Sequence, residues 1–174
     1  WISNAPFVYV AIGWARNAAG EIHRMILERG MEGLSTPTTH GKWSLRASAT
    51  GELVFDNVKV PKENIFPNVK GLKGPLGCLT KARFGIAWGA IGAAMDCYDT
   101  ALRYSKEREQ FGKPIGSFQL QQKKLAEMLT EITKAQLLNW RLGVLMSEGK
   151  ASPQQVSMAK RNACEVATNI CRDA

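Results

Sequence analysis

The side chains that most often carry out chemistry in proteins are few in this sequence, and they do not cluster. The two histidines, His23 and His40, match no motif, and the four cysteines contain no Cys-x-x-Cys pair. These spacings indicate neither a zinc site nor a redox motif, so we expect no metal. We interpret all four cysteines as reduced thiols. Cys164 and Cys171 lie seven residues apart, which suits core packing on one helix face.

Anion binding by lysine and arginine is the second chemistry that the composition offers. The 174 residues include 23 Lys and Arg against 15 Asp and Glu, a formal net charge of +8. A basic protein can attract nucleic acid, a membrane surface or an anionic small molecule, or its charges can simply be solvated. Because the basic residues are scattered, a solvated surface and an anionic small ligand both stay open.

The ends and the apolar runs suggest a piece of a larger protein without a membrane span. The longest nearly uncharged run, 84–95, is too short to cross a bilayer, and no signal peptide is visible. The chain begins at Trp1 and ends at Ala174 within a helical pattern that has no stop signal. We therefore expect both ends to be cuts from a longer parent.

The elements that position these residues change type along the chain. The apolar segments 7–14 and 22–27 flank the turn-forming residues 17–20 and predict a β-hairpin. Residues 52–60 give the clearest strand pattern, and Pro61 ends it. The segment 63–77 is rich in Pro and Gly, which is typical of a linker.

Three helices are predicted after this segment. The first covers about 79–106, where glycines at 85, 89 and 92 suggest close packing against neighbours. Ser117 is predicted to cap an amphipathic helix whose apolar residues recur from Leu125 to Leu145, and Gly149 ends it. Ser152, with Pro153 and Gln155, predicts a capping box for the third helix. The expected apolar face of that helix consists of Val156, Ala159, Ala163, Val166 and Ile170.

Strands followed by helices predict an α+β fold. We expect part of an antiparallel β-barrel or sandwich domain at residues 1–66. A partial up-down helical bundle at residues 67–174 would follow, with three of four helices present.

Five ordered motifs are more specific than these patterns. They are Trp1-Ile2-Ser3-Asn4; Leu45-Arg46-Ala47-Ser48 with Thr50-Gly51; Val58-x-Val60-Pro61-x-x-Asn64; Arg108-x-Gln110-Phe111-Gly112-Lys113-Pro114-Ile115 with Gln119; and Lys124-Leu125-Ala126-Glu127-Met128. In order and spacing, across almost the whole chain, they resemble the acyl-CoA dehydrogenase family. Segments 44–51, 82–89 and 123–133 resemble its glutaryl-CoA dehydrogenase branch.

Some residues depart from that branch. Phe84 stands where it usually has Tyr, and Thr80 and Lys81 stand where it usually has Asn, which leaves the acyl substrate open. Residues 139–142 and Pro153 are similar to short-chain acyl-CoA oxidases. An oxidase and a short-chain dehydrogenase therefore stay as alternatives.

The resemblance implies an FAD cofactor. It assigns FAD binding to Trp1, Ile2, Ser3, Arg108, Gln110, Phe111 and Gln119. The Trp1 indole would lie near the flavin ring, and Ser3 would bond to its polar edge. Arg108 would bind the pyrophosphate from a neighbouring subunit, since a guanidinium is always charged and offers forked donors. From the residues alone, Trp1 can instead be a core aromatic, Arg108 a solvated residue, and Phe111 a core anchor of its loop.

The resemblance also implies an acyl-CoA channel. Its lining would be Leu76, Gly77, Cys78, Leu79, Thr80, Lys81, Ala82 and Arg83. Arg83 is the strongly polar member, and it would either contact the ligand or form an ion pair that supports the site. For the apolar residues of this set, packing against other helices is the alternative to lining a channel.

The reaction implied by the resemblance is α,β-dehydrogenation of an acyl thioester. A glutamate removes the α-proton, the flavin takes the β-hydride, and glutaryl-CoA then loses carbon dioxide to give crotonyl-CoA. The family's usual Tyr-Glu-Gly-Thr stretch is absent, and Ala82 stands where some relatives place the glutamate. We therefore expect no catalytic residue in this chain, and we expect the isolated chain to be inactive.

The resemblance further implies an electron-transferring flavoprotein as acceptor and a homotetrameric parent. The compartment would be the bacterial cytoplasm or the mitochondrial matrix. A competing class is a non-enzymatic basic module, which would bind nucleic acid in a strongly salt-dependent way. We expect no nucleic acid partner.

Overall fold

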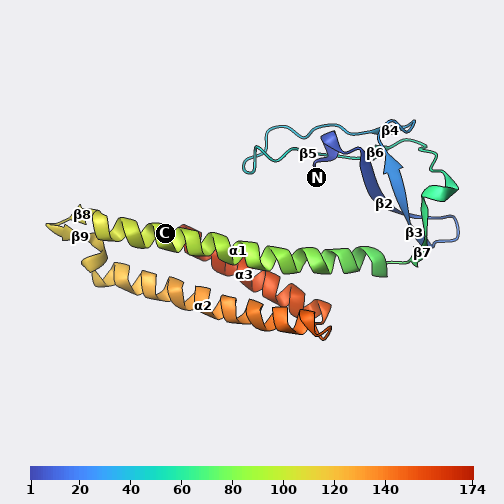
Figure 1. Ribbon diagram of the computed structural model, residues 1–174. Coiled ribbons are helices and arrows are strands. Elements are labelled where there is room, and N and C mark those ends of the chain that lie inside the picture. The colour runs from blue at the N-terminus through green and yellow to red at the C-terminus, as the bar shows by residue number, and fades with distance from the viewer. The chain divides into compact units, whose positions relative to one another are not determined.

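The computed structural model describes residues 1–174, which form two compact units, Trp1–Leu76 and Gly77–Ala174 (Figure 1). The first unit consists mainly of strands and the second mainly of helices, so the predicted α+β fold is confirmed. The domain limits expected from the sequence, at residues 66 and 67, stay a prediction. None of the three helices combines the length and the apolar character that a bilayer crossing requires.

The predicted β-hairpin is present. Strands β2 (Val10–Arg16) and β3 (Ile22–Glu28) pair antiparallel along their whole length. The turn between them is closed by Gly20, whose N–H donates to the Asn17 carbonyl and whose φ of 82° suits glycine. The first strand starts later than predicted because Ala5–Phe7 form a short 3-10 helix.

The predicted linker at 63–77 is wrong. Within it, β7 (Ile65–Lys70) pairs antiparallel with β3 and completes a three-stranded sheet in the order β2-β3-β7. The branched and aromatic residues of β7 favour a strand, and an edge strand tolerates Pro67. The Gly71 N–H then donates to the Ile22 carbonyl at 2.9 Å, which ties the segment before the first helix to β3.

The long strand predicted at 52–60 is also wrong, because only Val54–Phe55 (β6) is extended and paired. It pairs with β4 (Leu34–Ser35), and the left-handed φ of 52° at Asn57 turns the chain soon afterwards. A further pair joins β1 (Ile2–Ser3) to β5 (Thr50–Gly51). All pairings are antiparallel, and the sheets do not close into a barrel.

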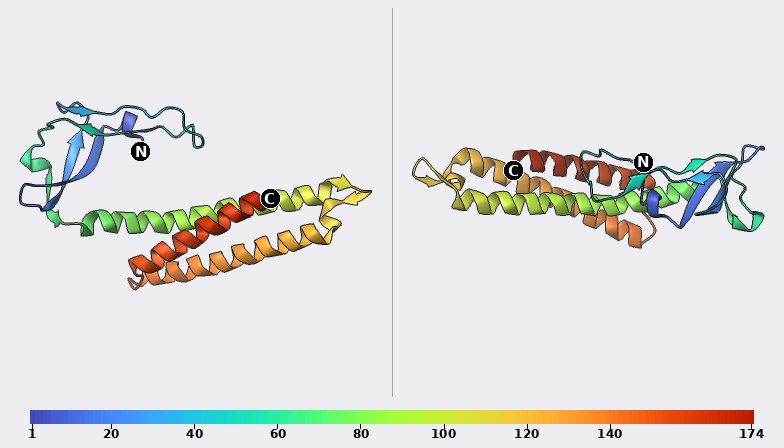
Figure 2. Two further views of the ribbon diagram at one scale, coloured as in Figure 1. Left: turned by 180° about the vertical axis from the view of Figure 1, so that it is seen from behind. Right: turned by 90° about the horizontal axis from the view of Figure 1, so that it is seen from above.

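Three helices make up the second unit, as predicted (Figures 1 and 2). They are α1 (Lys73–Glu107), α2 (Gln119–Ser147) and α3 (Pro153–Asp173). The first begins six residues earlier than expected, because a proline such as Pro75 is compatible with a first helical turn. The short strands β8 (Glu109–Gln110) and β9 (Lys113–Pro114) form a hairpin between α1 and α2.

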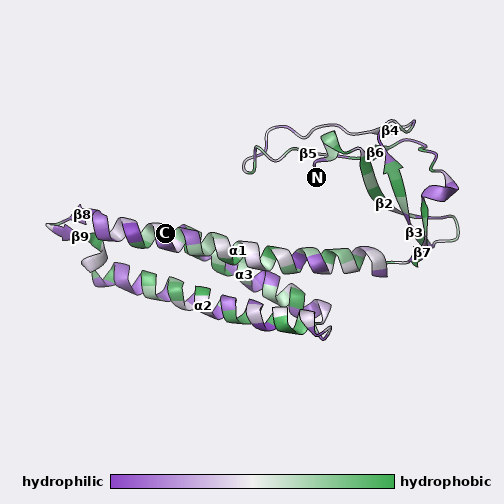
Figure 3. Ribbon diagram, viewed as in Figure 1, coloured by the Kyte–Doolittle hydropathy of each residue, from purple (hydrophilic) through white to green (hydrophobic).

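The core of the helical unit consists mainly of small and branched side chains. Apolar and polar residues alternate along the helices in the ribbon coloured by hydropathy (Figure 3). The buried cluster consists of Ala87, Ile91, Ala94, Met128, Ile132, Ala135, Ala163, Val166, Ala167 and Ile170. Every residue of the predicted α3 face is buried. Within this chain the expected packing at Gly85, Gly89 and Gly92 is not formed, because a Cβ at these positions would meet nothing within 4 Å.

Of the two serines predicted to cap a helix, one does so and the other does not. Ser152 forms the predicted capping box: its hydroxyl accepts the Gln155 N–H, and the Gln155 side chain accepts the Ser152 N–H. Ser117 does not cap α2. Its hydroxyl donates instead to the Pro114 carbonyl at 2.7 Å, and Phe118 occupies the N-cap position.

Candidate cofactor and substrate sites

A hollow of about 390 Å³ lies in the first unit beside Trp1 and Ser3, two residues predicted to bind FAD. The pairing of β1 with β5 places Ser3 opposite Thr50, which brings the loop that precedes β5 to the same place. The lining residues are Trp1, Ser3, Thr39, Lys42, Trp43, Ser44, Leu45, Ser48 and Thr50.

The hollow combines planar aromatic surface with hydroxyl groups. Trp1 and Trp43 are almost fully exposed, at 94% and 101%, so both indoles can stack on a flat ring. The Lys42 ammonium donates to the Ser48 carbonyl at 2.7 Å and to the Thr50 hydroxyl at 2.8 Å, which fixes the loop around it. A planar heterocycle with polar edges, such as a flavin, fits this set of groups.

The sequence prediction missed part of this lining. Segment 44–51 was recognised as a family motif, but Lys42 and Trp43 were given no role. The signal that could have identified Trp43 is a large aromatic next to a lysine in a segment rich in Ser and Thr.

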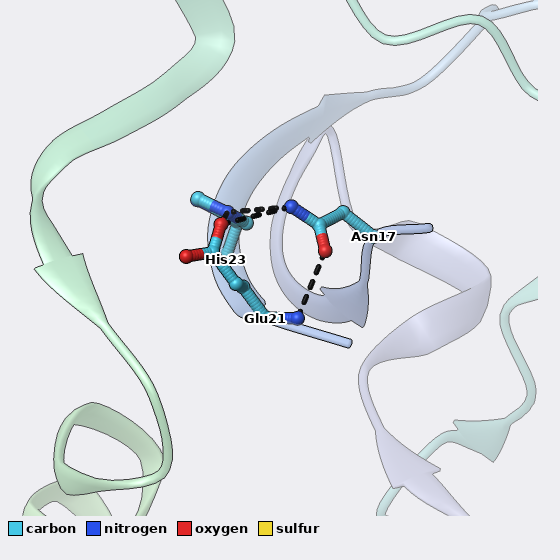
Figure 4. Close-up of polar contacts among 3 residues, drawn as sticks. All are labelled: Asn17, Glu21 and His23. Atoms are coloured by element: carbon cyan, nitrogen blue, oxygen red, sulfur yellow. Dashed lines mark hydrogen bonds and ion pairs between the residues drawn. The ribbon is translucent and has the colours of Figure 1, made fainter. Parts of the chain in front are cut away.

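A separate polar cluster closes the β2–β3 turn (Figure 4). The Asn17 carboxamide oxygen accepts the Glu21 N–H at 2.8 Å, and its nitrogen donates to the Glu21 carboxylate at 3.1 Å. His23 Nε2 lies 3.4 Å from the same carboxylate. The bond from Asn17, and then that from His23, lower the pKa of Glu21 below its ordinary value. His23 thus supports the turn.

Four of the predicted FAD ligands surround the β8–β9 hairpin. Arg108, Gln110, Phe111 and Gln119 are all exposed. The hairpin is held by the Ile115 N–H, which donates to the Arg108 carbonyl at 2.8 Å. The structure brings these four residues to one end of the helical unit, where α1 ends and α2 begins.

Phe111 is the most unusual member of this group. It and Gly112 form the two-residue hairpin loop with φ values of 56° and 75°, as a type I′ turn requires. The Phe111 ring is 84% exposed and meets Phe118 edge-on, with ring centroids 6.2 Å apart. The interpretation of Phe111 as a core anchor is therefore wrong. Strained residues such as this one persist where the surrounding structure holds them, often at functional sites.

The predicted channel residues, 76–83, lie in the first turns of α1. Leu76 and Leu79 are about half exposed, at 51% and 48%, and Cys78 is exposed, so none of the three is a core residue of its unit. Arg83 is half-buried and takes part in none of the salt bridges of the chain. An ion pair within this chain, one of the two roles considered for Arg83, is therefore not formed.

The two predicted groups of the helical unit lie at opposite ends of α1. At about 1.5 Å per residue, the helix from Arg83 to Glu107 spans about 36 Å. That distance exceeds the length of an extended dinucleotide. Arg83 and Arg108 of one chain therefore cannot surround the same small ligand.

Comparison with known proteins gives these positions their context. Residues 70–174 match the family model described as acyl-CoA dehydrogenase, C-terminal domain. The chain is 40% identical to a glutaryl-CoA dehydrogenase of Desulfococcus multivorans, over all of this chain and 46% of that protein. It is 37% identical to the mitochondrial short/branched chain specific acyl-CoA dehydrogenase of Bos taurus, over 96% of this chain and 40% of that protein.

A solved structure gives the same result for the fold. The crystal structure of a glutaryl-CoA dehydrogenase from Mycobacterium smegmatis in complex with FADH2 superposes with a TM-score of 0.95 at 41% identity. The match covers 99% of this chain and 44% of that one, so the chain spans less than half the length of these relatives. The match to the family model covers more than half of the chain. The chain belongs to the acyl-CoA dehydrogenase family.

Proposed function

We propose that the protein containing this chain is an FAD-dependent acyl-CoA dehydrogenase that oxidises glutaryl-CoA. The observation that carries the proposal is the hollow lined by two exposed indoles together with several hydroxyl-bearing residues. Membership of the family and the likeness to a structure that holds FADH2 support a flavin as the planar ligand.

Trp1, Ile2 and Ser3 would hold the flavin ring, and we add Trp43 as a second ring contact. Arg108 would bind the pyrophosphate of the cofactor with its forked donors, which have no ion-pair partner in the chain. Gln110, Phe111 and Gln119 would complete the cofactor site. When bound, FAD supplies the acceptor for the hydride that leaves the β-carbon of the substrate.

Residues 76–83 would form one wall of the acyl-CoA channel, with Arg83 as an anion-binding group. A half-buried guanidinium without a carboxylate partner is suited to a phosphate or a carboxylate of the ligand. We assign the general base to no residue of this chain, because the methyl group of Ala82 cannot accept a proton. Loss of carbon dioxide from the oxidised glutaryl group would give crotonyl-CoA.

The separation of Arg83 and Arg108 along α1 is compatible with an oligomer. Arg83 would contact acyl-CoA and Arg108 the FAD pyrophosphate, so the two residues would hold different ligands. The family resemblance implies that Arg108 reaches the cofactor of a neighbouring subunit and that the parent is a homotetramer. An electron-transferring flavoprotein would reoxidise the cofactor, in the bacterial cytoplasm or the mitochondrial matrix.

The test is to express the full reading frame that includes these residues and to add acyl-CoA thioesters under anaerobic conditions. Bleaching of the flavin absorbance by glutaryl-CoA, with release of crotonyl-CoA and carbon dioxide, supports the proposal. A protein that purifies without flavin and shows no response to any acyl-CoA contradicts it.

A second candidate substrate is a neutral short or branched acyl-CoA, favoured by the 37% identity to the Bos taurus enzyme. It predicts bleaching by such thioesters without release of carbon dioxide. An acyl-CoA oxidase would differ from both dehydrogenases by forming hydrogen peroxide during aerobic turnover.

A further inference from the structure

Two cysteines that belong to neither candidate site meet between α1 and α3. The Sγ atoms of Cys97 and Cys171 lie 3.3 Å apart, although the residues are 74 positions apart in the sequence. The buried residues Ile91 and Ala94 of α1 and Ile170 of α3 belong to the same packed cluster, against which Cys97 also packs. Folding of the helical unit therefore creates this contact between two thiols.

The two thiols differ in their surroundings. Cys97 is half-buried, whereas Cys171 is exposed, so a reagent can reach the Cys171 thiol. The pKa of Cys97 is raised, first by its hydrogen bond with Cys171 and then by burial. The other two cysteines, Cys78 and Cys164, have no second thiol within hydrogen-bonding distance. The interpretation of Cys171 as a core-packing residue of α3 is wrong, since it lies at the edge of the core beside Cys97.

We propose that Cys97 and Cys171 are a reversible oxidation site that forms a disulfide between α1 and α3 in the presence of a low-molecular-weight disulfide such as glutathione disulfide. The thiolate of Cys171 attacks glutathione disulfide and releases one glutathione. The thiolate of Cys97 then attacks the Cys171 sulfur and releases the second glutathione. The two cysteines lose two electrons and two protons, and one glutathione disulfide becomes two glutathione molecules.

The geometry requires only a small adjustment. A disulfide bond is about 2.0 Å long, so the sulfurs must approach by about 1.3 Å from their separation of 3.3 Å.

The experiment is equilibration of the native protein in glutathione redox buffers, followed by acid quenching, alkylation of free thiols and tryptic mass mapping. Cys97 lies in peptide 84–103, but peptide 162–172 contains both Cys164 and Cys171. The mapping is therefore done in the Cys164→Ser variant. We expect peptides 84–103 and 162–172 to be linked within one chain. We also expect the ratio of disulfide to glutathione adduct to be at least tenfold higher in the native protein than in guanidinium.

The variants give the controls. Cys97→Ser should leave a glutathione adduct on Cys171, while Cys78→Ser should leave the linkage unchanged. A native protein that accumulates only glutathione adducts would overturn the proposal. So would one that links these peptides only between chains, as judged by non-reducing electrophoresis, or that shows the same ratio in guanidinium.

Discussion

The Asn139 carboxamide of α2 donates a hydrogen bond of 2.9 Å to the Ala87 carbonyl of α1, within the core of the helical unit. Asn139 is only 1% exposed, and its Oδ1 has no hydrogen-bond partner. The bond is therefore a polar link between two helices in otherwise apolar surroundings, and it restricts how α2 can slide along α1.

The first prediction concerns this link. Asn139→Ala removes the bond and leaves a cavity, so the free energy of unfolding should fall by about 2 to 3 kcal/mol. Asn139→Leu also removes the unpaired oxygen and fills the space, so it should cost less than Asn139→Ala. Leu137→Ala, at a site that is 59% exposed, is the control and should change stability by about 0.5 kcal/mol or less. Urea denaturation measures all three variants. Equal losses for the two Asn139 variants would contradict the cost assigned to the cavity, since both variants lack the hydrogen bond and Oδ1.

The second prediction concerns the β8–β9 loop. Gly112→Ala should destabilise the protein by about 1 to 2 kcal/mol, because alanine is strained at a φ of 75° while no neighbour contacts the position. The free energy of unfolding of Phe111→Asn should lie within about 0.5 kcal/mol of the wild-type value, since relief of backbone strain offsets the lost contact with Phe118. Only Phe111→Asn is then expected to weaken FAD binding without a loss of stability. Thermal unfolding and flavin titration of both variants test this difference.

The third prediction concerns the start of α3. Ser152→Ala removes the side-chain half of the capping box and should cost about 1 kcal/mol of unfolding free energy. Ser157→Ala is a matched control, because the Ser157 hydroxyl only donates to the Pro153 carbonyl one turn earlier, at 2.9 Å. Chemical denaturation should show a clearly larger loss of unfolding free energy for Ser152→Ala than for Ser157→Ala. The reverse order would mean that the capping box does not stabilise the helix.

The fourth prediction concerns pH and the β2–β3 turn. The folded pKa of Glu21 is below the ordinary value of 4.5, so its contribution to stability is present above that value and is lost as pH falls through the folded pKa. Asn17→Ala removes the largest cause, and the pKa of Glu21 should rise towards 4.5. NMR titration of the Glu21 carboxyl group measures this change in pKa. The control Asn68→Ala, on a different strand, should leave the pKa of Glu21 unchanged.

The helical half of the fold was predictable because its signals are local. The capping box at Ser152 and the apolar spacing of α3 use contacts within a few residues, and both were correct. The β half depends on partners far away in the sequence. Strand β7 was mistaken for a linker because its Pro67 suggests a break, whereas pairing with β3 overrides that local preference.

The residues proposed for the candidate site came from motifs and not from composition, and their roles stay a prediction. Trp1 and Ser3 were proposed as FAD ligands through the family pattern, and β1–β5 pairing places them beside a loop in which the pattern gave Lys42 and Trp43 no role. Trp43 was missed because only the folded chain shows that its indole is fully exposed beside Trp1 and Ser3. The contact between Cys97 and Cys171 was missed for the same reason, since it depends on how α3 packs on α1.

The most direct test of the account is an FAD titration of the protein in its full reading frame, followed by flavin fluorescence. If Trp43 and Arg108 hold the cofactor, Trp43→Ala and Arg108→Ala should each weaken binding by about tenfold to a hundredfold, because a stacking contact or a charge-assisted bond is worth about 1.5 to 3 kcal/mol. Lys150→Ala, at an exposed position paired only with Glu148, should leave the affinity unchanged. A protein that binds no FAD, or whose affinity is the same in all three variants, would contradict the proposed cofactor site.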